Sequence, residues 1–324
     1  MAVQMTVIGL GQIGTSIGLA LAGRTDVIYR VGHDHDRQVM KQAREMNAFD
    51  ATQFNLPTAV EKADVVVLCL PLDQVEETLK YIAADLREDA VVLDFSPLKE
   101  VAAGWFASHV PAGRHYVGLI PAINPQLMEE KNHGITAASA NLFQHATIGI
   151  TAPHPARPEA LKLAEDVVRL LGSEPLFLDL LEADGLMMTA HFLPQVLSVA
   201  LLHATVGLPG WMEARRFAGR PYARVSSALT AENSTALGLA LQQNPARTAN
   251  ALNLVIGALT HLRDAVLAAD GPDLQKRLQT AEQDLAAWEK DRFAANWNQE
   301  GEKPAIDPGE WVKRLFLGQS LGKK

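Results

Sequence analysis

Three glycines near the N-terminus are the residues whose spacing specifies chemistry most directly. The segment Gly9-Leu10-Gly11-Gln12-Ile13-Gly14 follows an apolar run and precedes a helical pattern. In such a turn, the first glycine allows a sharp bend, the second lets the backbone approach a pyrophosphate, and the third lets the helix pack closely against the strand. The start of the helix adds free N–H groups and the positive end of its dipole. The segment predicts a dinucleotide-binding loop with contacts from Gly9, Gly11, Gln12, Ile13 and Gly14.

An acidic residue supports this prediction. Asp34 stands twenty residues after Gly14, where a carboxylate is expected to bond the hydroxyls of the adenine ribose. Asp34 would repel a 2′-phosphate, which favours NAD, whereas Arg37 lies within reach of such a phosphate and keeps NADP as the alternative. Residues 33–36 alternate His and Asp, but strand neighbours point to opposite faces and no further ligand cluster follows. We therefore predict no metal site.

Two further segments are expected at the edge of the sheet where this loop lies. Leu70-Pro71 ends one apolar run, and Ser96 and Lys99 follow another that ends at Phe95. The carboxyl ends of parallel strands border the crevice in which ligands bind. We expect Leu70 and Pro71 to contact the cofactor, and Ser96 and Lys99 to lie near its nicotinamide half. For Lys99 the alternative is a solvated position on a helix.

The elements that must position these residues alternate along the first 181 residues. Short runs rich in β-branched residues alternate with longer helical patterns, which indicates a doubly wound, Rossmann-like, mostly parallel sheet. Fully apolar runs such as 65–70 are typical of strands buried on both faces. The expected strands are Val3–Gly9, Val27–Gly32, Val65–Leu70, Val91–Phe95, His115–Leu119, Thr147–Thr151 and Leu176–Leu180, and the expected helices are Ile13–Ala22, Arg37–Met46, Leu72–Ala84, Lys99–Ala107 and Pro158–Leu171.

Residues 182–324 are expected to form a separate, all-helical domain for substrate binding and dimerisation. The first expected helix, Ala183–Val206, is apolar on nearly all sides, and such a helix must be covered on all sides. We expect two subunits to bury these helices against each other in a homodimer, with a monomeric bundle as the alternative. The other expected helices are Ser234–Gln243, Pro245–Ala269 and Pro272–Ala295.

Composition narrows the classes of partner. The formal net charge of −8 argues against a surface for nucleic acid or anionic membranes. The apolar stretch Phe192–Trp211 contains Pro194 and Gln195, so we expect a bent, buried helix rather than a membrane span. The single cysteine, Cys69, lies in an apolar run and is expected to be an inert core residue. A reducing, cytoplasmic compartment fits this usage.

Beyond these patterns, the chain resembles the prephenate and arogenate dehydrogenase family over most of its length. The glycine loop and the strand ends at 70–71 and 94–99 match, and Tyr116–Pro121 stands where the family has a glycine-histidine-proline segment. Residues 182–187 resemble the entry to the family's long interdomain helix. The segment His191–Gln195 resembles a serine-histidine-leucine-proline-histidine stretch. Arg220 and Arg224 match two family arginines four residues apart, and Asn244 follows where the family has an asparagine.

The resemblance implies a nucleotide domain followed by a dimerising helical domain. It also implies hydride removal from a ring carbon that bears a hydroxyl, with NAD(P) as acceptor. Paired arginines suit the substrate carboxylates, so Arg220 and Arg224 are the expected anion-binding pair, four residues apart. Asn124 is a candidate polar contact in the crevice.

The sequence departs from the family at the acid–base positions. Ile120 stands at the position of the family's catalytic histidine and cannot accept a proton. Pro97 replaces a serine, although Ser96 is one residue earlier. Phe192 and Gln195 replace two further histidines. His191 is the remaining candidate base, together with Ser96, and the alternative for His191 is a histidine satisfied by neighbouring groups.

We therefore expect an NAD(P)-dependent dehydrogenase similar to prephenate dehydrogenase, acting on a small carboxylate-bearing compound. Two alternatives remain. The loss of the family histidine is compatible with a dinucleotide-binding regulator that no longer catalyses hydride transfer. A nucleotide domain joined to a helical dimerisation domain is also compatible with a reductase of another keto acid or of an imine.

Overall fold

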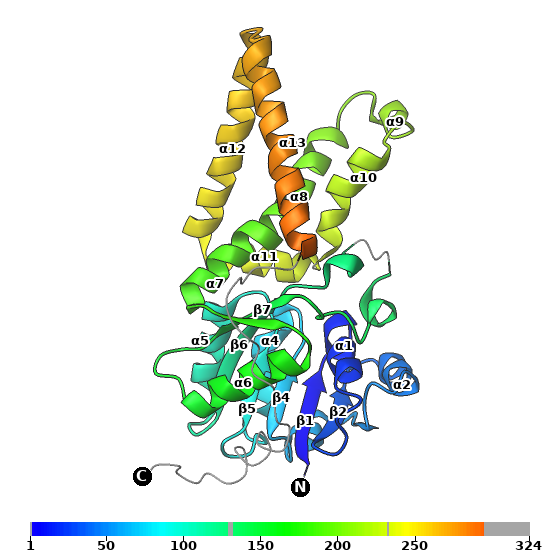
Figure 1. Ribbon diagram of the computed structural model, residues 1–324, viewed down its shortest axis with the longest axis vertical. Helices are drawn as coiled ribbons and strands as arrows, with labels where there is room; N and C mark the ends of the chain where they lie inside the picture. Colours follow the sequence, from blue (N-terminus) through cyan, green and yellow to red (C-terminus); the bar gives the residue numbers. More distant parts are fainter. Residues whose placement is uncertain (1, 129–131, 232, 295–324) are drawn as a thin grey trace. The chain divides into compact units, whose positions relative to one another are not determined.

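The computed structural model describes residues 2–128, 132–231 and 233–294 (Figure 1). By contacts between Cα atoms the chain divides into two compact units. The sheet unit comprises Met1–Leu70, Gln74–Ala183 and the chain from Lys290 onward. The helical unit comprises Pro71–Asp73 and Asp184–Glu289. The last part of the expected helical domain, from residue 295, lies outside the described residues.

The sheet unit is built on a sheet of eight strands in the order β3-β2-β1-β4-β5-β6-β7-β8. All neighbouring pairs are parallel except β6 and β7, which are antiparallel. This architecture confirms the predicted doubly wound, mostly parallel α/β fold. The strands are β1 Val3–Ile8, β2 Ile28–His33, β3 Ala51–Thr52, β4 Val65–Leu68, β5 Val91–Asp94, β6 His115–Pro121, β7 Thr147–Thr151 and β8 Glu174–Phe177.

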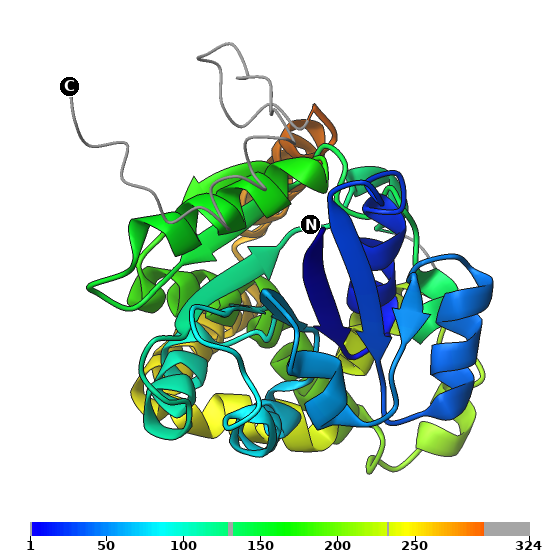
Figure 2. The same ribbon diagram turned by 90° about the horizontal axis from the view of Figure 1, so that it is seen from below.

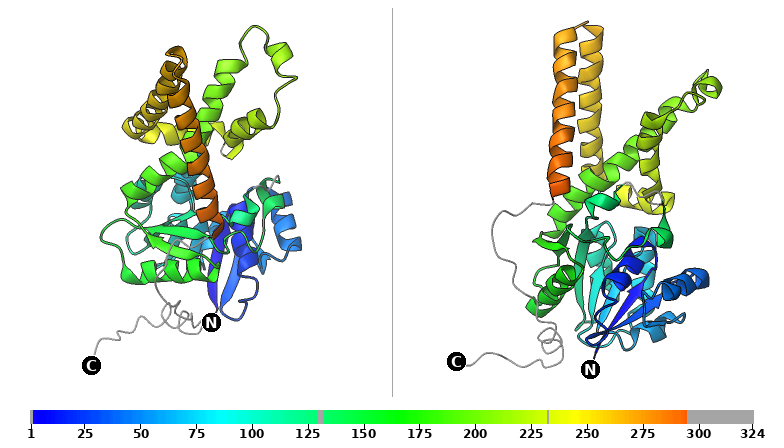
Figure 3. Two further views of the ribbon diagram at one scale, coloured as in Figure 1. Left: turned by 45° about the horizontal axis from the view of Figure 1, so that its top comes forward. Right: turned by 45° about the vertical axis from the view of Figure 1, so that its right-hand side comes forward.

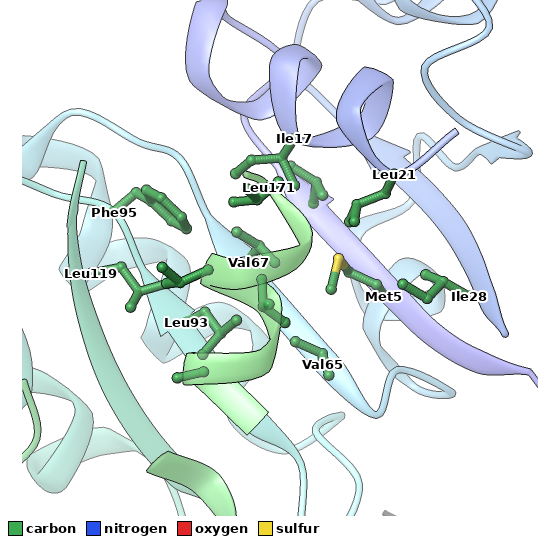
Figure 4. Close-up of a cluster of buried hydrophobic side chains, with 14 of the residues drawn as sticks. Met5, Ile17, Leu21, Ile28, Val65, Val67, Leu93, Phe95, Leu119 and Leu171 are labelled. Carbon is green, nitrogen blue, oxygen red and sulfur yellow. The ribbon is translucent and has the colours of Figure 1, made fainter. Parts of the chain in front are cut away.

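Helices cover both faces of the sheet (Figure 2). Successive side chains of a strand point to opposite faces, so Val65 and Val67 of β4 join one apolar cluster while Val66 and Leu68 join the other. Figure 4 shows the first cluster, in which Met5, Val67 and Leu93 meet side chains from helices. The helices packed on this face are α1 Gln12–Ala20, α2 Arg37–Glu45 and α6 Pro158–Leu170, and those on the other face are α3 Leu56–Val60, α4 Leu72–Ile82 and α5 Lys99–His109.

In the sheet unit the sequence-based expectation missed one strand and one α-helix and misplaced the end of another strand. The two-residue strand β3 and the five-residue helix α3 are too short to produce a periodic pattern. Strand β8 ends at Phe177, because the next helix already begins at Leu180, whereas the expected strand ran to Leu180. The remaining strands and helices of this unit occur within a few residues of their expected bounds.

The residues after Asp184 are helical, with no strand among those that the structure describes. Figure 3 shows α12 and α13 side by side, joined through a turn at Asp270. The helices are α7 Leu180–Met187, α8 Leu193–Thr205, α9 Trp211–Ala214, α10 Arg220–Ser227, α11 Ser234–Gln243, α12 Pro245–Leu267 and α13 Gly271–Ala294.

The expected single helix Ala183–Val206 is interrupted. A π turn, Met188–Phe192, separates α7 from α8. Pro194 has no backbone N–H to donate to the carbonyl four residues earlier, so the regular ladder of hydrogen bonds fails at this turn. By length and apolar composition alone, Leu180–Thr205 would be able to cross a membrane, which is weak evidence for a span. Much of this stretch is exposed in the single chain, which differs from the expected buried helix.

Arg30 of β2 ties the first helix to the sheet. Its Nη1 donates to the carbonyl oxygens of Gly18 in α1 (2.8 Å) and of Ala48 (2.9 Å). Its Nη2 and Nε donate to the two carboxylate oxygens of Asp50, at 2.7 and 3.1 Å. Burial of Asp50 acts to raise the pKa of its carboxyl group, but the hydrogen bonds from Arg30 outweigh it and hold that pKa below its ordinary value of 3.8.

We predict that Asp50→Asn destabilises the protein by about 2 kcal/mol at neutral pH, because a charge-assisted pair is lost. Because the pKa is lowered by folding, the stabilisation is present above pH 3.8 and is lost as the pH falls through the folded-state pKa. The difference in urea unfolding between wild type and variant should therefore shrink in acid. Asp26→Asn, at an exposed position, is the control. A difference independent of pH would contradict this account.

Candidate functional site

The glycine turn between β1 and α1 has steric reasons for two of its glycines. Gly9 has a φ of +92°, and a Cβ there would lie 2.3 Å from the carbonyl oxygen of Cys69. A Cβ at Gly14 would lie 1.9 Å from the carbonyl oxygen of Gly9. At Gly11, by contrast, a Cβ would meet no described atom within 4 Å. The first and third glycines thus allow the turn to close, and the second borders open space.

Asp34 holds this turn from the end of β2. Its Oδ2 accepts a hydrogen bond from the backbone N–H of Leu10 at 2.8 Å, and its Oδ1 accepts one from Asp36 at 2.9 Å. The imidazole of His35 lies 3.2 Å from the same Oδ1. The carboxylate is nearly buried, and each of its oxygens has a second lone pair for a further donor. Asp34 therefore organises the turn as well as standing at the expected ribose position.

The start of α1 remains open to an acceptor. Gly11 is its N-cap and provides no side-chain hydrogen bond to the first turn, and the first N–H groups of a helix have no partner within the helix. Gln12 Nε2 donates to the carbonyl of Ala137 at 3.3 Å, and Ile13 packs against the core. Leu70 lies beside Gly9, its Cδ2 3.1 Å from the position of a Cβ there. The residues present fit a pyrophosphate cradle.

Arg37 begins α2 two residues beyond the His35 that flanks Asp34. Its guanidinium lies over the ring of Phe54, 4.0 Å from the ring centroid, and both side chains are exposed. An arginine stacked on a ring keeps its edge N–H groups free for an anion. The position is compatible with contacts to the adenosine half of either NAD or NADP.

A buried polar cluster lies where β5 ends. The Asp94 carboxylate accepts hydrogen bonds from Ser96 Oγ at 2.7 Å and from Tyr116 OH at 2.8 Å. Lys99 Nζ donates to the carbonyl oxygens of Asp94 and Ser96 and lies 3.3 Å from Asp94 Oδ2. Lys99 and Asp94 are both fully buried. Sequence analysis proposed Ser96 and Lys99 but missed Asp94 and Tyr116, which join them.

The surroundings of this cluster are closely packed. A Cβ at Gly118 would lie 2.6 Å from Lys99 Cδ and 3.0 Å from Thr151 Cγ2. Burial, followed by the charge of Asp94, raises the pKa of the Cys69 thiol, so the thiol stays protonated. Asn124 uses both ends of its amide within its own loop, accepting from the N–H of Gln126 at 3.0 Å and donating to the carbonyl of Asn141 at 3.1 Å.

The other site residues predicted from the sequence lie in the helical unit, on helix α10 and in the π turn. Arg220 and Arg224 stand one turn apart on α10, both are exposed, and neither forms an ion pair within the described part of the chain. His191 lies in the π turn, half-buried, with its ring 5.0 Å from that of Phe192 in an edge-to-face contact. Gln195, which was not a candidate, is 1% exposed in the first turn of α8. The sequence signal that could have identified Gln195 is its place in the segment His191–Gln195, where the family motif has a histidine.

No group of three or more His, Cys, Asp or Glu side chains arranged to hold a metal ion occurs among the described residues.

Known proteins that are similar to this chain are named as dehydrogenases. A sequence profile described as the prephenate dehydrogenase nucleotide-binding domain matches residues 17–175, beginning just beyond the glycine turn. Cyclohexadienyl dehydrogenase of Zymomonas mobilis is 22% identical over 89% of this chain and 96% of its own length. Two solved structures share the fold. Prephenate dehydrogenase from A. aeolicus, in complex with hydroxyphenyl propionate and NAD+, has a TM-score of 0.78 at 17% identity, covering 89% of this chain and 98% of that chain. Synechocystis arogenate dehydrogenase has a TM-score of 0.67 at 22% identity, covering 88% and 99%.

The sheet topology, the glycine turn and its buried carboxylate form a dinucleotide-binding domain, and the relatives that are named as dehydrogenases identify an NAD(P)-dependent dehydrogenase. The helical second unit and the profile match indicate which dehydrogenases this chain is similar to. The chain resembles the prephenate dehydrogenase family.

The turn geometry predicts opposite outcomes for two glycines. Gly11→Val should leave the melting temperature nearly unchanged, because its side chain enters open space, yet should abolish the rise in melting temperature that NAD produces. Gly14→Ala should lower the melting temperature itself, because its Cβ would overlap the Gly9 carbonyl. Both are measured by thermal denaturation with and without NAD. A Gly11→Val protein with an unchanged NAD response would contradict the pyrophosphate assignment.

Proposed function

We propose that the protein oxidises a cyclohexadienyl carboxylate that carries a ring hydroxyl, prephenate or arogenate, with NAD as hydride acceptor. The glycine turn with Asp34 supports the cofactor half of this proposal, and the exposed pair Arg220 and Arg224 supports an anionic substrate. The names of the relatives, cyclohexadienyl dehydrogenase and arogenate dehydrogenase, agree with this substrate class. The arginine pair is the observation that carries the substrate assignment.

NAD is favoured over NADP because of the charge at the end of β2. The Asp34 carboxylate lies beside the turn, where a 2′-phosphate would meet a like charge with little water between them. Its second lone pairs remain available to ribose hydroxyls. Arg37 is the group that would favour NADP, and its stacking on Phe54 supports a contact with the adenosine half in either case.

The arginine pair is suited to hold a carboxylate. A guanidinium presents paired N–H donors that match the two oxygens of a carboxylate. Arg220 follows the N-cap of α10, where the positive end of the helix dipole also favours an anion. Holding the acid in one orientation is a large part of what a dehydrogenase must do, because the donor carbon has to be in line with the hydride acceptor.

The proton of the substrate hydroxyl needs an acceptor other than residue 120. Ile120 has no group that can bind a proton. We propose His191 as that acceptor, because it is the histidine of the π turn and a neutral imidazole has a ring nitrogen that can accept a proton. Ser96, hydrogen-bonded to the buried Asp94, is the second candidate. Lys99 and Asn124 remain weaker candidates for substrate contacts, since their polar atoms already bond neighbouring groups.

We predict that the purified protein reduces NAD in the presence of prephenate or arogenate, and that Arg224→Met raises KM by about 10- to 100-fold through loss of a charge-assisted bond. Absorbance at the wavelength of reduced nicotinamide measures the rate. Arg215→Met, also exposed in the helical unit, is the matched control and should leave KM unchanged. Failure of both acids to support reduction would refute the substrate assignment.

The isoleucine at residue 120, where the family has a histidine, favours a second candidate function, that of a dinucleotide-binding regulator. A chain that keeps the cofactor turn and lacks the family histidine is suited to sense a dinucleotide without catalysis. The same assay separates the two functions. A rate that His191→Ala abolishes supports the dehydrogenase, whereas binding of NAD with no hydride transfer to either acid supports the regulator.

We also propose that the protein is a cytoplasmic homodimer formed through the helical unit. The long helix α12 exposes large apolar side chains, among them Leu259 (59% exposed), Leu262 (36%) and Val266 (60%). Their spacings of three and four residues put them on one face. Apolar patches of this kind on a soluble protein mark an interface, and a second copy would cover the face symmetrically.

We predict that the wild-type protein sediments at twice the mass of one chain and that Leu259→Glu converts it to a monomer, because a buried charge would be added twice across a symmetric interface. Sedimentation equilibrium measures the mass. Tyr81→Glu, at an exposed position on α4, is the control and should remain dimeric. A monomeric wild-type protein at micromolar concentration would contradict the proposal.

A further inference from the structure

We propose that Gln195 selects the substrate by accepting a hydrogen bond from its ring hydroxyl through the side-chain oxygen Oε1. The inference rests on the proposed function, because it takes the ligand to be a hydroxylated ring acid. It adds a specificity residue on the helical unit at a position where the family motif has a histidine. A carboxamide accepts a hydrogen bond without taking the proton, so Gln195 would hold the hydroxyl of the bound acid and His191 would take its proton only during hydride transfer.

The π turn fixes the orientation of this side chain. Gln195 Nε2 donates to the carbonyl oxygen of His191, one turn earlier, at 3.1 Å. That carbonyl can only accept, so the NH2 end of the amide points to the π turn and the oxygen points the other way. The bond also supplies a donor at the turn where Pro194 interrupts the helix ladder. The amide is therefore held in a single orientation by the backbone of its own helix.

The oxygen itself has no hydrogen-bond partner in the described part of the chain. Gln195 is 1% exposed, and among the residues that the structure describes no donor lies within hydrogen-bond distance of Oε1. A buried acceptor without a donor is costly, and native proteins satisfy nearly all such atoms. An oriented, buried oxygen of this kind calls for an O–H or N–H group from elsewhere. An anionic group would be repelled, so the hydroxyl of the acid, and not its carboxylate, is the matching part.

Helix α10, which carries the arginine pair, lies beside α8 near Gln195. Ser198 Oγ, three residues beyond Gln195, donates to the carbonyl oxygen of Val225, the residue that follows Arg224. This bond joins α8 to α10 at a level only about 4.5 Å along the helix axis from Gln195. Arg224 would hold the carboxylate end while Gln195 receives the hydroxyl.

The test compares two acids that differ only in the hydroxyl. Binding of 3-(4-hydroxyphenyl)propanoate and of 3-phenylpropanoate is measured by calorimetry on the full-length protein saturated with NAD. We expect wild type to bind the hydroxylated acid about tenfold more tightly. Gln195→Met, which keeps the side-chain length and removes the acceptor, should lose that preference while its affinity for 3-phenylpropanoate stays the same. Gln242→Met, exposed on α11, is the matched control and should keep the preference.

Each other result overturns the inference. Equal affinity of wild type for the two acids means that an internal water satisfies Oε1, and this comparison needs no variant to fold. A preference that survives in Gln195→Met assigns the hydroxyl to another residue. A wild-type protein that binds neither acid refutes the inference together with the proposed substrate class. A persistent rise in melting temperature with NAD would show that the cofactor half of the proposed function is unaffected.

Discussion

The close approach of Gly14 to the carbonyl oxygen of Gly9 is the constraint on which the rest of the sheet unit depends. A Cβ at residue 14 would lie 1.9 Å from the carbonyl oxygen of Gly9. Helix α1 can therefore start at this position only because residue 14 has no side chain. This close start directs the first helical N–H groups to the edge where β1 and β4 end. Asp34 then fixes the turn through the N–H of Leu10, and Arg30 fixes the body of the helix through Gly18. Cofactor binding and helix packing thus share one set of contacts.

The two units combine different solutions to the same problem of holding an anion. In the proposed function the sheet unit would use backbone N–H groups at a helix start, which no substitution except one to proline removes and which carry no net charge. The helical unit would use the guanidinium groups of Arg220 and Arg224, which are exposed. A pyrophosphate common to many enzymes suits the first solution. A substrate that differs among relatives suits the second, because side chains change more readily than backbone.

The sequence predicts most of the fold because its strands are fully apolar and its glycine turn has a fixed spacing. It misses β3, since two residues such as Ala51 and Thr52 show no periodicity. The functional site is harder to predict from the sequence than the fold is. Lys99 follows a strand end like a ligand-binding residue, yet its charge is neutralised by Asp94, a partnership that depends on side-chain direction. The proposed role of Gln195 rests on an oxygen atom that has no hydrogen-bond partner among the described residues, and no sequence pattern records whether a partner is absent.

Gly118 carries a consequence for how this protein can change over generations. Its missing side chain leaves the space that the Lys99 methylene groups fill, with Thr151 on the other side. An alanine at residue 118 would be accepted only after residue 99 had become shorter, and a shorter residue 99 would leave the Asp94 carboxylate buried without its cation. The three positions 94, 99 and 118 are therefore epistatic, and the order in which they can be replaced is restricted.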